Sequence, residues 1–236
     1  MDRKAAVFFD VDDTLYDLQW PFRMAVRDIF DGKYDDRAGD LFIRCRFHTD
    51  ALFEDYSKGK LSPEDFHSRR HLFGFSDCGI RISDREAADL LSSYRSYQKK
   101  ITMSEVTKEM LRGLEAKGVI TGIISNGVSG PQWEKIRTLR IPELIPEERI
   151  IVSGDVGCVK PHREIFDLTR ERLGLAYTDL WYVGDNYEVD IMSSKAAGWK
   201  TVWVNKRERT APDGGSLADF TVKDEESLAA LMGKVI

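Results

Sequence analysis

The sequence is poor in cysteine, carries no excess of basic residues and has no long hydrophobic run. Its three cysteines, Cys45, Cys78 and Cys158, form no C-x-x-C pair, which argues against a disulfide framework or a thiolate zinc site. The formal net charge of −5 gives no electrostatic basis for binding nucleic acid or an anionic membrane. The apolar run at residues 5–9 ends too early for a signal peptide, and no segment has membrane-spanning length. We therefore expect a cytoplasmic protein that binds neither nucleic acid nor a membrane.

Short apolar runs alternate with helical patterns after residue 100. A chain that alternates in this way is expected to form a doubly wound parallel sheet with helices on both faces. The first strand of this sheet is predicted at residues 5–9, before the alternation begins. The later strands are predicted at residues 119–124, 149–153, 180–183, 201–204 and 219–222.

The stretch between the first strand and the alternating part differs in character, because it is rich in charged and aromatic residues and reads as about four helices. Ser62 before Pro63 and the capping box that begins at Ser83 both mark helix starts. The stretch is too long to be a loop. We therefore predict a helical cap domain at residues 18–98, inserted into an α/β core formed by residues 1–17 and 99–236.

Acidic side chains follow two of the predicted strands. Asp10 and Asp12 come directly after the first strand, and Asp185 comes after the strand at 180–183, with Asp190 five residues further on. Ligands bind at the carboxyl ends of the strands in open α/β sheets. Carboxylates that converge there raise one another's pKa or require a cation. Oxygen ligands without nearby His or Cys favour a hard cation, and Mg²⁺ suits a site shared with phosphate.

Residues suited to phosphate binding follow other strands. Ser125, Asn126 and Gly127 offer a hydroxyl and backbone N–H groups near a helix N-terminus, and Lys160 offers a positive charge. A carboxylate beside such a site can attack phosphorus. Each cluster alone is also typical of a turn, a helix cap or an ordinary surface lysine, so the inference depends on their occurrence together.

Four segments together resemble the motifs of the haloacid dehalogenase superfamily, in family order and each after its expected strand. They are FFDVDDTL at residues 8–15, IISNG at 123–127, GCVKP at 157–161 and VGDNYEVD at 183–190. The resemblance spans about residues 5–205, and the helical insert resembles the family's helical cap.

The resemblance implies a role for each matching residue. Asp10 would be the nucleophile and a metal ligand. Asp12 would act as general acid and base, and its main-chain carbonyl would bind the metal. Asp185 would be the second side-chain ligand of Mg²⁺. The phosphate would be bound by Ser125, Asn126, Gly127 and Lys160, with Lys160 also neutralising charge on Asp10. Supporting roles would fall to Asp190, which would orient the metal shell or Lys160, and to Thr14 and Asn186.

The resemblance also implies an activity, namely hydrolysis of a small phosphorylated metabolite through an aspartyl-phosphate on Asp10. The dehalogenases of the superfamily carry a different residue at the position of Asp12 and use no metal, so Asp12 favours the phosphatases. A sugar-phosphate mutase is the alternative, and a dehalogenase or a non-catalytic binding module is less favoured. The sequence identifies neither the substrate nor the oligomeric state.

Two groups of residues in the predicted cap have a simpler interpretation. His67 and His71 are spaced to share a helix face, but no third metal ligand accompanies them, so we interpret them as solvated or packed. Basic residues of the cap either contact an anionic substrate or cover a helix surface, and we interpret them as surface residues. They are Arg44, Arg46, Arg69 and Arg70.

Overall fold

The structure is a computed structural model, and it describes residues 5–175, 179–212, 214 and 217–236. The chain divides into two compact units. One unit combines residues 1–17 with 102–236, and the other comprises residues 18–101. In the part of the chain that the structure describes, no helix is both long enough and apolar enough to span a bilayer.

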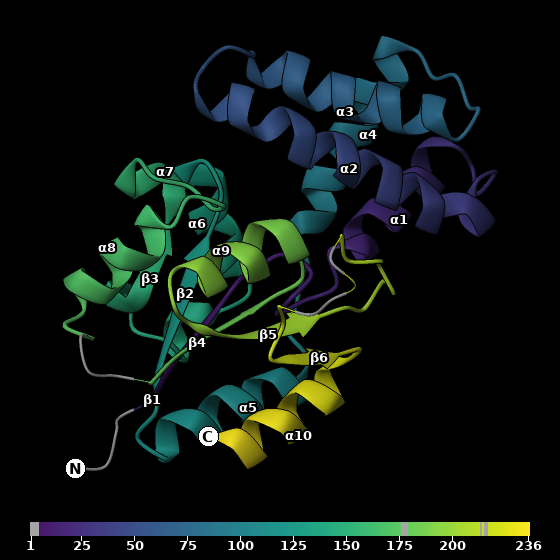
Figure 1. The fold of residues 1–236 in the computed structure, drawn as a ribbon. Coiled ribbons are helices and arrows are strands. Elements are labelled where there is room, and N and C mark those ends of the chain that lie inside the picture. The colour runs from purple at the N-terminus through teal and green to yellow at the C-terminus, as the bar shows by residue number, and fades with distance from the viewer. Residues whose placement is uncertain (1–4, 176–178, 213, 215–216) are drawn as a thin grey trace. The chain divides into compact units, whose positions relative to one another are not determined.

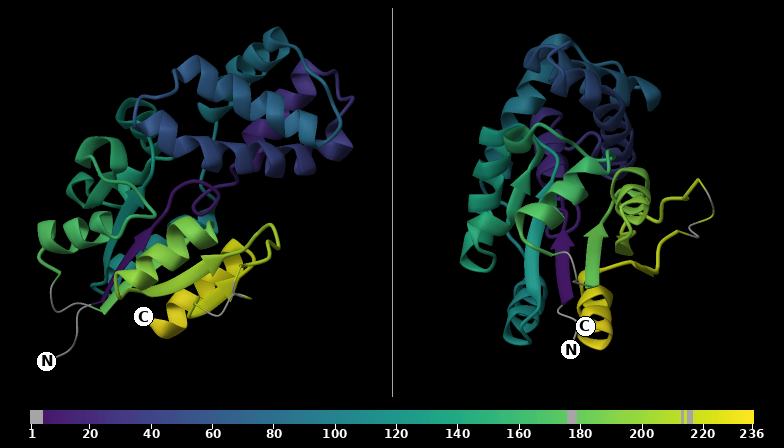
Figure 2. Two further views of the ribbon diagram at one scale, coloured as in Figure 1. Left: turned by 45° about the horizontal axis from the view of Figure 1, so that its top comes forward. Right: turned by 60° about the vertical axis from the view of Figure 1, so that its left-hand side comes forward.

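The first unit contains a six-stranded parallel sheet with the strand order β3-β2-β1-β4-β5-β6. The arrows of its central strands point the same way in Figure 2. The strands are β1 (Ala5–Phe9), β2 (Ile120–Ser125), β3 (Ile150–Val152), β4 (Asp179–Gly184), β5 (Lys200–Val204) and β6 (Phe220–Val222). Strands at the centre are almost wholly buried, which explains why they appear in the sequence as continuous apolar runs.

Helices cover both faces of this sheet, as Figure 1 shows. On one face α5 (Glu105–Ala116) packs beside α10 (Glu225–Val235). On the other face α8 (Glu164–Arg172) buries Ile165 and Phe166 against the sheet residues Phe8 and Tyr182. The remaining helical elements are α6 (Ser129–Thr138), η2 (Ile141–Glu143), η3 (Glu147–Arg149), α7 (Ser153–Val156), the π-helical turn η4 (Tyr187–Met192) and α9 (Ser193–Ala196). The predicted doubly wound α/β class is confirmed.

The second unit is entirely helical over residues 18–101. Within it α2 packs on α3, and α1 packs on α4. Ser62 caps α3 by accepting a hydrogen bond from the Asp65 N–H, and Ser83 forms a capping box with Glu86, so both predicted helix starts are confirmed. The elements are α1 (Gln19–Ile29), η1 (Asp35–Arg37), α2 (Ala38–Ser57), α3 (Pro63–Asp77) and α4 (Asp84–Gln98).

Candidate active site

Three neighbouring strands bring the predicted motifs to one edge of the sheet. β1 lies between β2 and β4, so Asp10, Ser125 and Asp185 stand at the carboxyl ends of adjacent parallel strands. The Asp10 N–H still donates a ladder hydrogen bond of 2.9 Å to the Val183 carbonyl, which fixes Asp10 against β4. The chain therefore places chemically active groups at the position where parallel sheets bind ligands.

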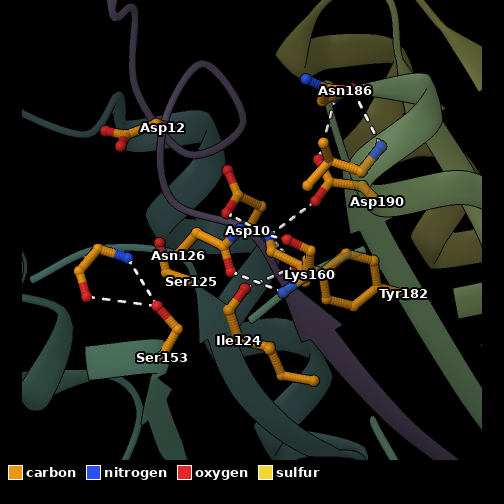
Figure 3. Close-up of polar contacts among 12 residues, drawn as sticks. Asp10, Asp12, Ile124, Ser125, Asn126, Ser153, Lys160, Tyr182, Asn186 and Asp190 are labelled. Atoms are coloured by element: carbon orange, nitrogen blue, oxygen red, sulfur yellow. Dashed lines mark hydrogen bonds and ion pairs between the residues drawn. The ribbon is translucent and has the colours of Figure 1, made fainter. Parts of the chain in front are cut away.

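Lys160 lies at the centre of a buried polar cluster, which Figure 3 shows in close-up. Its Nζ donates to Asp10 Oδ1 at 2.8 Å, to Asp190 Oδ1 at 2.7 Å and to Tyr182 Oη at 2.8 Å. An ammonium group has three N–H donors, and here each has an acceptor. The side chain of Lys160 is only 2% exposed, so the lysine is a fixed internal cation and not a surface residue.

The partners of Lys160 are themselves held in place. The Tyr182 hydroxyl donates to the Ile124 carbonyl at 2.6 Å, and the Asn186 N–H donates to Asp190 Oδ2 at 3.0 Å. Gly184 is needed for this arrangement, because a Cβ at that position would overlap the Asp190 carboxylate. Because Gly184 has no side chain, the Asp190 carboxylate can lie directly against its main chain and within hydrogen-bond distance of Lys160.

Three buried carboxylates at this edge could hold a cation. Asp10, Asp185 and Asp190 each offer an oxygen, and these oxygens lie within 4.8 Å of one another. Asp185 is 4% exposed, and its Oδ2 lies 3.6 Å from Arg209 Nη1. A donor set made only of carboxylate oxygens favours a hard divalent cation. The Asp12 carboxylate is not part of this group, and Figure 3 shows it pointing away from Lys160.

Burial changes the protonation of the cluster. It raises the pKa of Asp10 to about 6, with smaller upward contributions from Asp190 and Asp12, while Lys160 acts in the opposite direction. Burial also disfavours the Lys160 ammonium, but the two carboxylates outweigh it and raise the pKa of Lys160 well above its usual value. Lys160 is therefore charged at neutral pH, and Asp10 is the member of the pair that exchanges a proton near pH 6.

The segment IISNG at residues 123–127 contributes a hydroxyl group that can bind a ligand and an amide that bonds to the main chain of Lys160. Ser125 Oγ accepts a hydrogen bond of 2.7 Å from Gln132 Nε2, which leaves its own proton available for a ligand. Asn126 instead bonds the main chain of Lys160 in both directions, at 2.8 and 2.9 Å. The Gly127 N–H donates to Ser153 Oγ at 3.0 Å. The Asn126 side chain therefore fixes the position of Lys160, and the Gly127 N–H is already bonded to Ser153.

Asp12 belongs to a second polar group, which is formed by α6 and the turn after β1. Lys135 Nζ donates to both carboxylate oxygens of Asp12, at 2.7 and 2.6 Å, and also to Gln132 Oε1 at 3.0 Å. The Tyr16 hydroxyl donates to Asp12 Oδ1 at 2.6 Å. Gln132 thus connects the Asp12–Lys135 pair to Ser125, because its amide also donates to that hydroxyl. Thr14 is buried, but its hydroxyl bonds to none of the described residues.

Sequence reasoning missed Gln132, Lys135, Tyr182 and Ser153. One signal for the first two was present, since residues three apart share a helix face and both lie on the helix that follows IISNG. Tyr182 gave no signal, because an aromatic residue inside an apolar strand is typical of core packing. After Lys160 the chain forms a turn in which the His162 N–H donates to the Val159 carbonyl, and α8 begins only at Glu164.

The chain is similar in sequence to named proteins and similar in fold to solved structures. Glyceraldehyde 3-phosphate phosphatase of Methanothermobacter thermautotrophicus is 28% identical over 229 residues, which cover 94% of this chain and 96% of that protein. Pyrimidine 5′-nucleotidase YjjG of Escherichia coli is 27% identical over 230 residues, which cover 97% of each chain. The magnesium-bound crystal structure of YfnB from Bacillus subtilis superposes with a TM-score of 0.70 at 22% identity and covers 98% of this chain and 99% of that one, so it supports the fold.

The family model described as haloacid dehalogenase-like hydrolase matches residues 7–204, a span that contains all four motifs. The expected resemblance is therefore confirmed, and the chain belongs to the haloacid dehalogenase-like hydrolase family.

Proposed function

We propose that this hydrolase is a Mg²⁺-dependent phosphatase of small phosphorylated metabolites and that it works through an aspartyl-phosphate on Asp10. The observation that carries the proposal is the contact of Lys160 Nζ with Asp10 and Asp190, beside a third carboxylate at Asp185. The named relatives add support, because both the archaeal phosphatase and the bacterial nucleotidase have names that denote phosphate-releasing enzymes.

The first half of the proposed reaction transfers the phosphoryl group to the protein. An oxygen of Asp10 attacks phosphorus and the ester bond to the leaving oxygen breaks, while Asp12 gives that oxygen a proton. Lys160 occupies Asp10 Oδ1, which leaves Oδ2 as the oxygen for attack. Ser125 Oγ–H and the Lys160 ammonium would stabilise the charge on the transferring oxygens.

The second half returns the protein to its starting state. Asp12 takes a proton from water, the water oxygen bonds to phosphorus, and the bond to Asp10 breaks to release phosphate. This step requires an ionised Asp12. The Lys135 ammonium, 2.6 and 2.7 Å from the two Asp12 oxygens, stabilises that form. We therefore propose Lys135 as a positioning residue that holds the Asp12 carboxylate once Asp12 has given its proton to the leaving oxygen.

The carboxylate set fits the metal that this chemistry calls for. Asp10 and Asp185 would supply side-chain ligands for Mg²⁺, with the Asp12 main-chain carbonyl as a further ligand. Asp190 is already bonded to Lys160 and would support the site. A bound Mg²⁺ would neutralise charge on the phosphate and on the attacking carboxylate.

Magnesium affinity is expected to fall below about pH 6. Burial raises the pKa of Asp10 to about 6, and a protonated carboxyl must lose its proton before it binds a cation. The dissociation constant for Mg²⁺ should therefore be nearly constant from pH 7 to 8 and should rise about tenfold per pH unit below pH 6. Calorimetric titration of Mg²⁺ at several pH values measures this, and equal affinity at pH 5 and pH 7 would contradict the assignment of Asp10 as a ligand.

The activity itself is tested with a panel of phosphate esters. We expect Mg²⁺-dependent release of inorganic phosphate from an aryl phosphate, a triose phosphate or a pyrimidine nucleoside monophosphate. Chelation should abolish the release, and added Mg²⁺ should restore it. Absence of phosphate release from every ester would overturn the proposal. An isomerised sugar phosphate without free phosphate would indicate a mutase, and halide release from a chlorinated acid would indicate a dehalogenase.

A further inference from the structure

The helical unit of residues 18–101 contains a pocket of its own. The pocket is partly open to solvent, and about 330 Å³ of space lies within it when the solvent at its mouth is included. Its walls combine apolar side chains with basic and polar ones, and all of them come from the helical unit. The residues that line it include Phe22, Phe42, Arg46, Arg70, His71 and Tyr94.

Arg70 is the unusual residue of this pocket. It was interpreted as a surface residue, but the structure corrects this: Arg70 is partly buried and its Nε is enclosed without a hydrogen-bond partner. Its guanidinium lies over the rings of Phe66 and Tyr94, with centroid distances of 5.8 and 5.7 Å. Among the described residues no carboxylate forms an ion pair with Arg70. Its neighbour Arg69 is exposed.

Burial lowers the pKa of the Arg70 guanidinium. Tyr94 and Cys45 act in the opposite direction, and the nearby cations Arg46 and Arg95 add smaller downward contributions. Arg46 is partly balanced by Asp50, whose Oδ1 lies 3.6 Å from Arg46 Nε. His71, which also lines the pocket, is 2% exposed and its Nδ1 has no hydrogen-bond partner, while burial and Arg70 hold its pKa well below the usual value. The charge of Arg70 thus has no ion-pair partner among the described residues, and the neighbouring His71 stays neutral.

A buried cation without a counter-charge is costly, and proteins retain one where a ligand supplies the missing charge. A planar guanidinium offers parallel N–H donors that match the two oxygens of a carboxylate or phosphate. Its stacking on two aromatic rings fixes that plane before a ligand arrives, which lowers the entropic cost of binding.

We propose that this pocket of the helical unit is a binding site for a small oxyanion, a carboxylate or phosphate group, bound by the Arg70 guanidinium. The aromatic wall formed by Phe22 and Phe42 would contact an apolar portion of the same ligand. The oxyanion belongs either to a second anionic group on the enzyme's own substrate or to a separate small metabolite.

Thermal unfolding in sulfate tests the site without any assumption about the enzyme's activity. The probe is sodium sulfate, compared with sodium chloride at equal ionic strength. Sulfate at ten times its dissociation constant should raise the Tm of the wild-type protein by at least about 3 °C more than it raises the Tm of Arg70→Met. In chloride, Arg70→Met should be at least as stable as the wild type, because it removes an uncompensated buried charge.

Arg69→Met is the matched control, since it removes the same charge from the adjacent, exposed position and should keep the full sulfate response. Arg70→Lys covers the case in which methionine disturbs packing, because it keeps the cation but loses the planar fork and should show a reduced response. General effects of sulfate on unfolding act equally on all four proteins. An equal sulfate response in the wild type, Arg69→Met and both Arg70 variants would overturn the proposal.

Steady-state kinetics then identify the source of the anion, and this arm alone rests on the proposed function. If the substrate supplies the anion, Arg70→Met should raise the KM for a phosphorylated carboxylic acid and leave the KM for an aryl phosphate unchanged. If a separate metabolite supplies it, both KM values should stay unchanged while the sulfate response is lost. Failure of phosphate release would leave the thermal test intact, so the two proposals fail separately.

Discussion

Asp10→Asn is expected to abolish phosphate release while the protein stays folded. Asparagine keeps the shape of the side chain and can still accept a hydrogen bond from Lys160 Nζ, but its amide cannot attack phosphorus. Removal of a nucleophile typically lowers kcat by a factor on the order of 10⁴ to 10⁶. The measurement is phosphate release by wild type and variant at saturating Mg²⁺ and pH 7.5, with circular dichroism to verify the fold.

The stability of this variant provides a second readout. Because burial raises the pKa of Asp10 to about 6, the folded chain binds this proton more tightly than the unfolded chain does. The stability that protonated Asp10 contributes is therefore lost as the pH rises from about 3.8 to about 6, whereas asparagine does not ionise. We expect the Asn variant to melt no lower than the metal-free wild type at pH 8. Asp179→Asn, at the opposite end of β4, is the matched control and should keep full activity. Turnover retained by Asp10→Asn would remove the nucleophile assignment.

Lys160→Met is expected to have the second large effect, on both activity and stability. The substitution leaves the Asp10 and Asp190 carboxylates buried without the cation that bonds to both of them. Breaking a buried ion pair in this way costs about 3–5 kcal/mol. For a chain of this size, the Tm should fall by roughly 6–20 °C. The loss should be smaller at pH 5 than at pH 8, because protonation of one carboxylate removes the repulsion.

A comparison with Lys135→Met isolates the effect of burial. Lys135 also pairs with an aspartate, but its side chain and that of Asp12 are 11% and 15% exposed, so solvent can compensate for part of the lost charge. We expect a smaller fall in Tm for Lys135→Met and a reduced kcat, since Asp12 loses the cation that holds its carboxylate in place. An unchanged Tm for Lys160→Met would mean that the buried cluster does not stabilise the fold.

The sequence allowed prediction of features that depend on local pattern. Runs such as residues 180–183 are apolar because the central strands are buried on both faces, so these strands can be recognised from the sequence. The acids follow these runs, and parallel strands end at one edge, so their proximity followed from the fold class. The capping residues Ser62 and Ser83 were predictable because a helix start needs an acceptor for its free N–H groups.

Features that depend on pairing across the chain were not predictable in this way. Lys135 bonds to a residue more than a hundred positions away, and its shared helix face with Gln132 does not identify that partner. Arg70 was interpreted as a surface residue for the same reason, since the Tyr94 ring under its guanidinium comes from α4 and reaches it only when α3 and α4 pack together. Tyr182 packs in the core and also accepts a hydrogen bond from Lys160, and only the packing can be inferred from the sequence pattern.

The division of the chain into two units has a consequence for how enzymes of this kind can diversify. The five groups that the proposed reaction uses lie outside residues 18–101, and both ends of that segment join the same unit. They are Asp10, Asp12, Ser125, Lys160 and Asp185. The helical insert can therefore accumulate substitutions, or be exchanged for that of a relative, without altering any atom that makes or breaks a bond. If the proposed pocket of the helical unit binds part of a ligand, substitutions there would change ligand preference and leave the proposed catalytic groups intact.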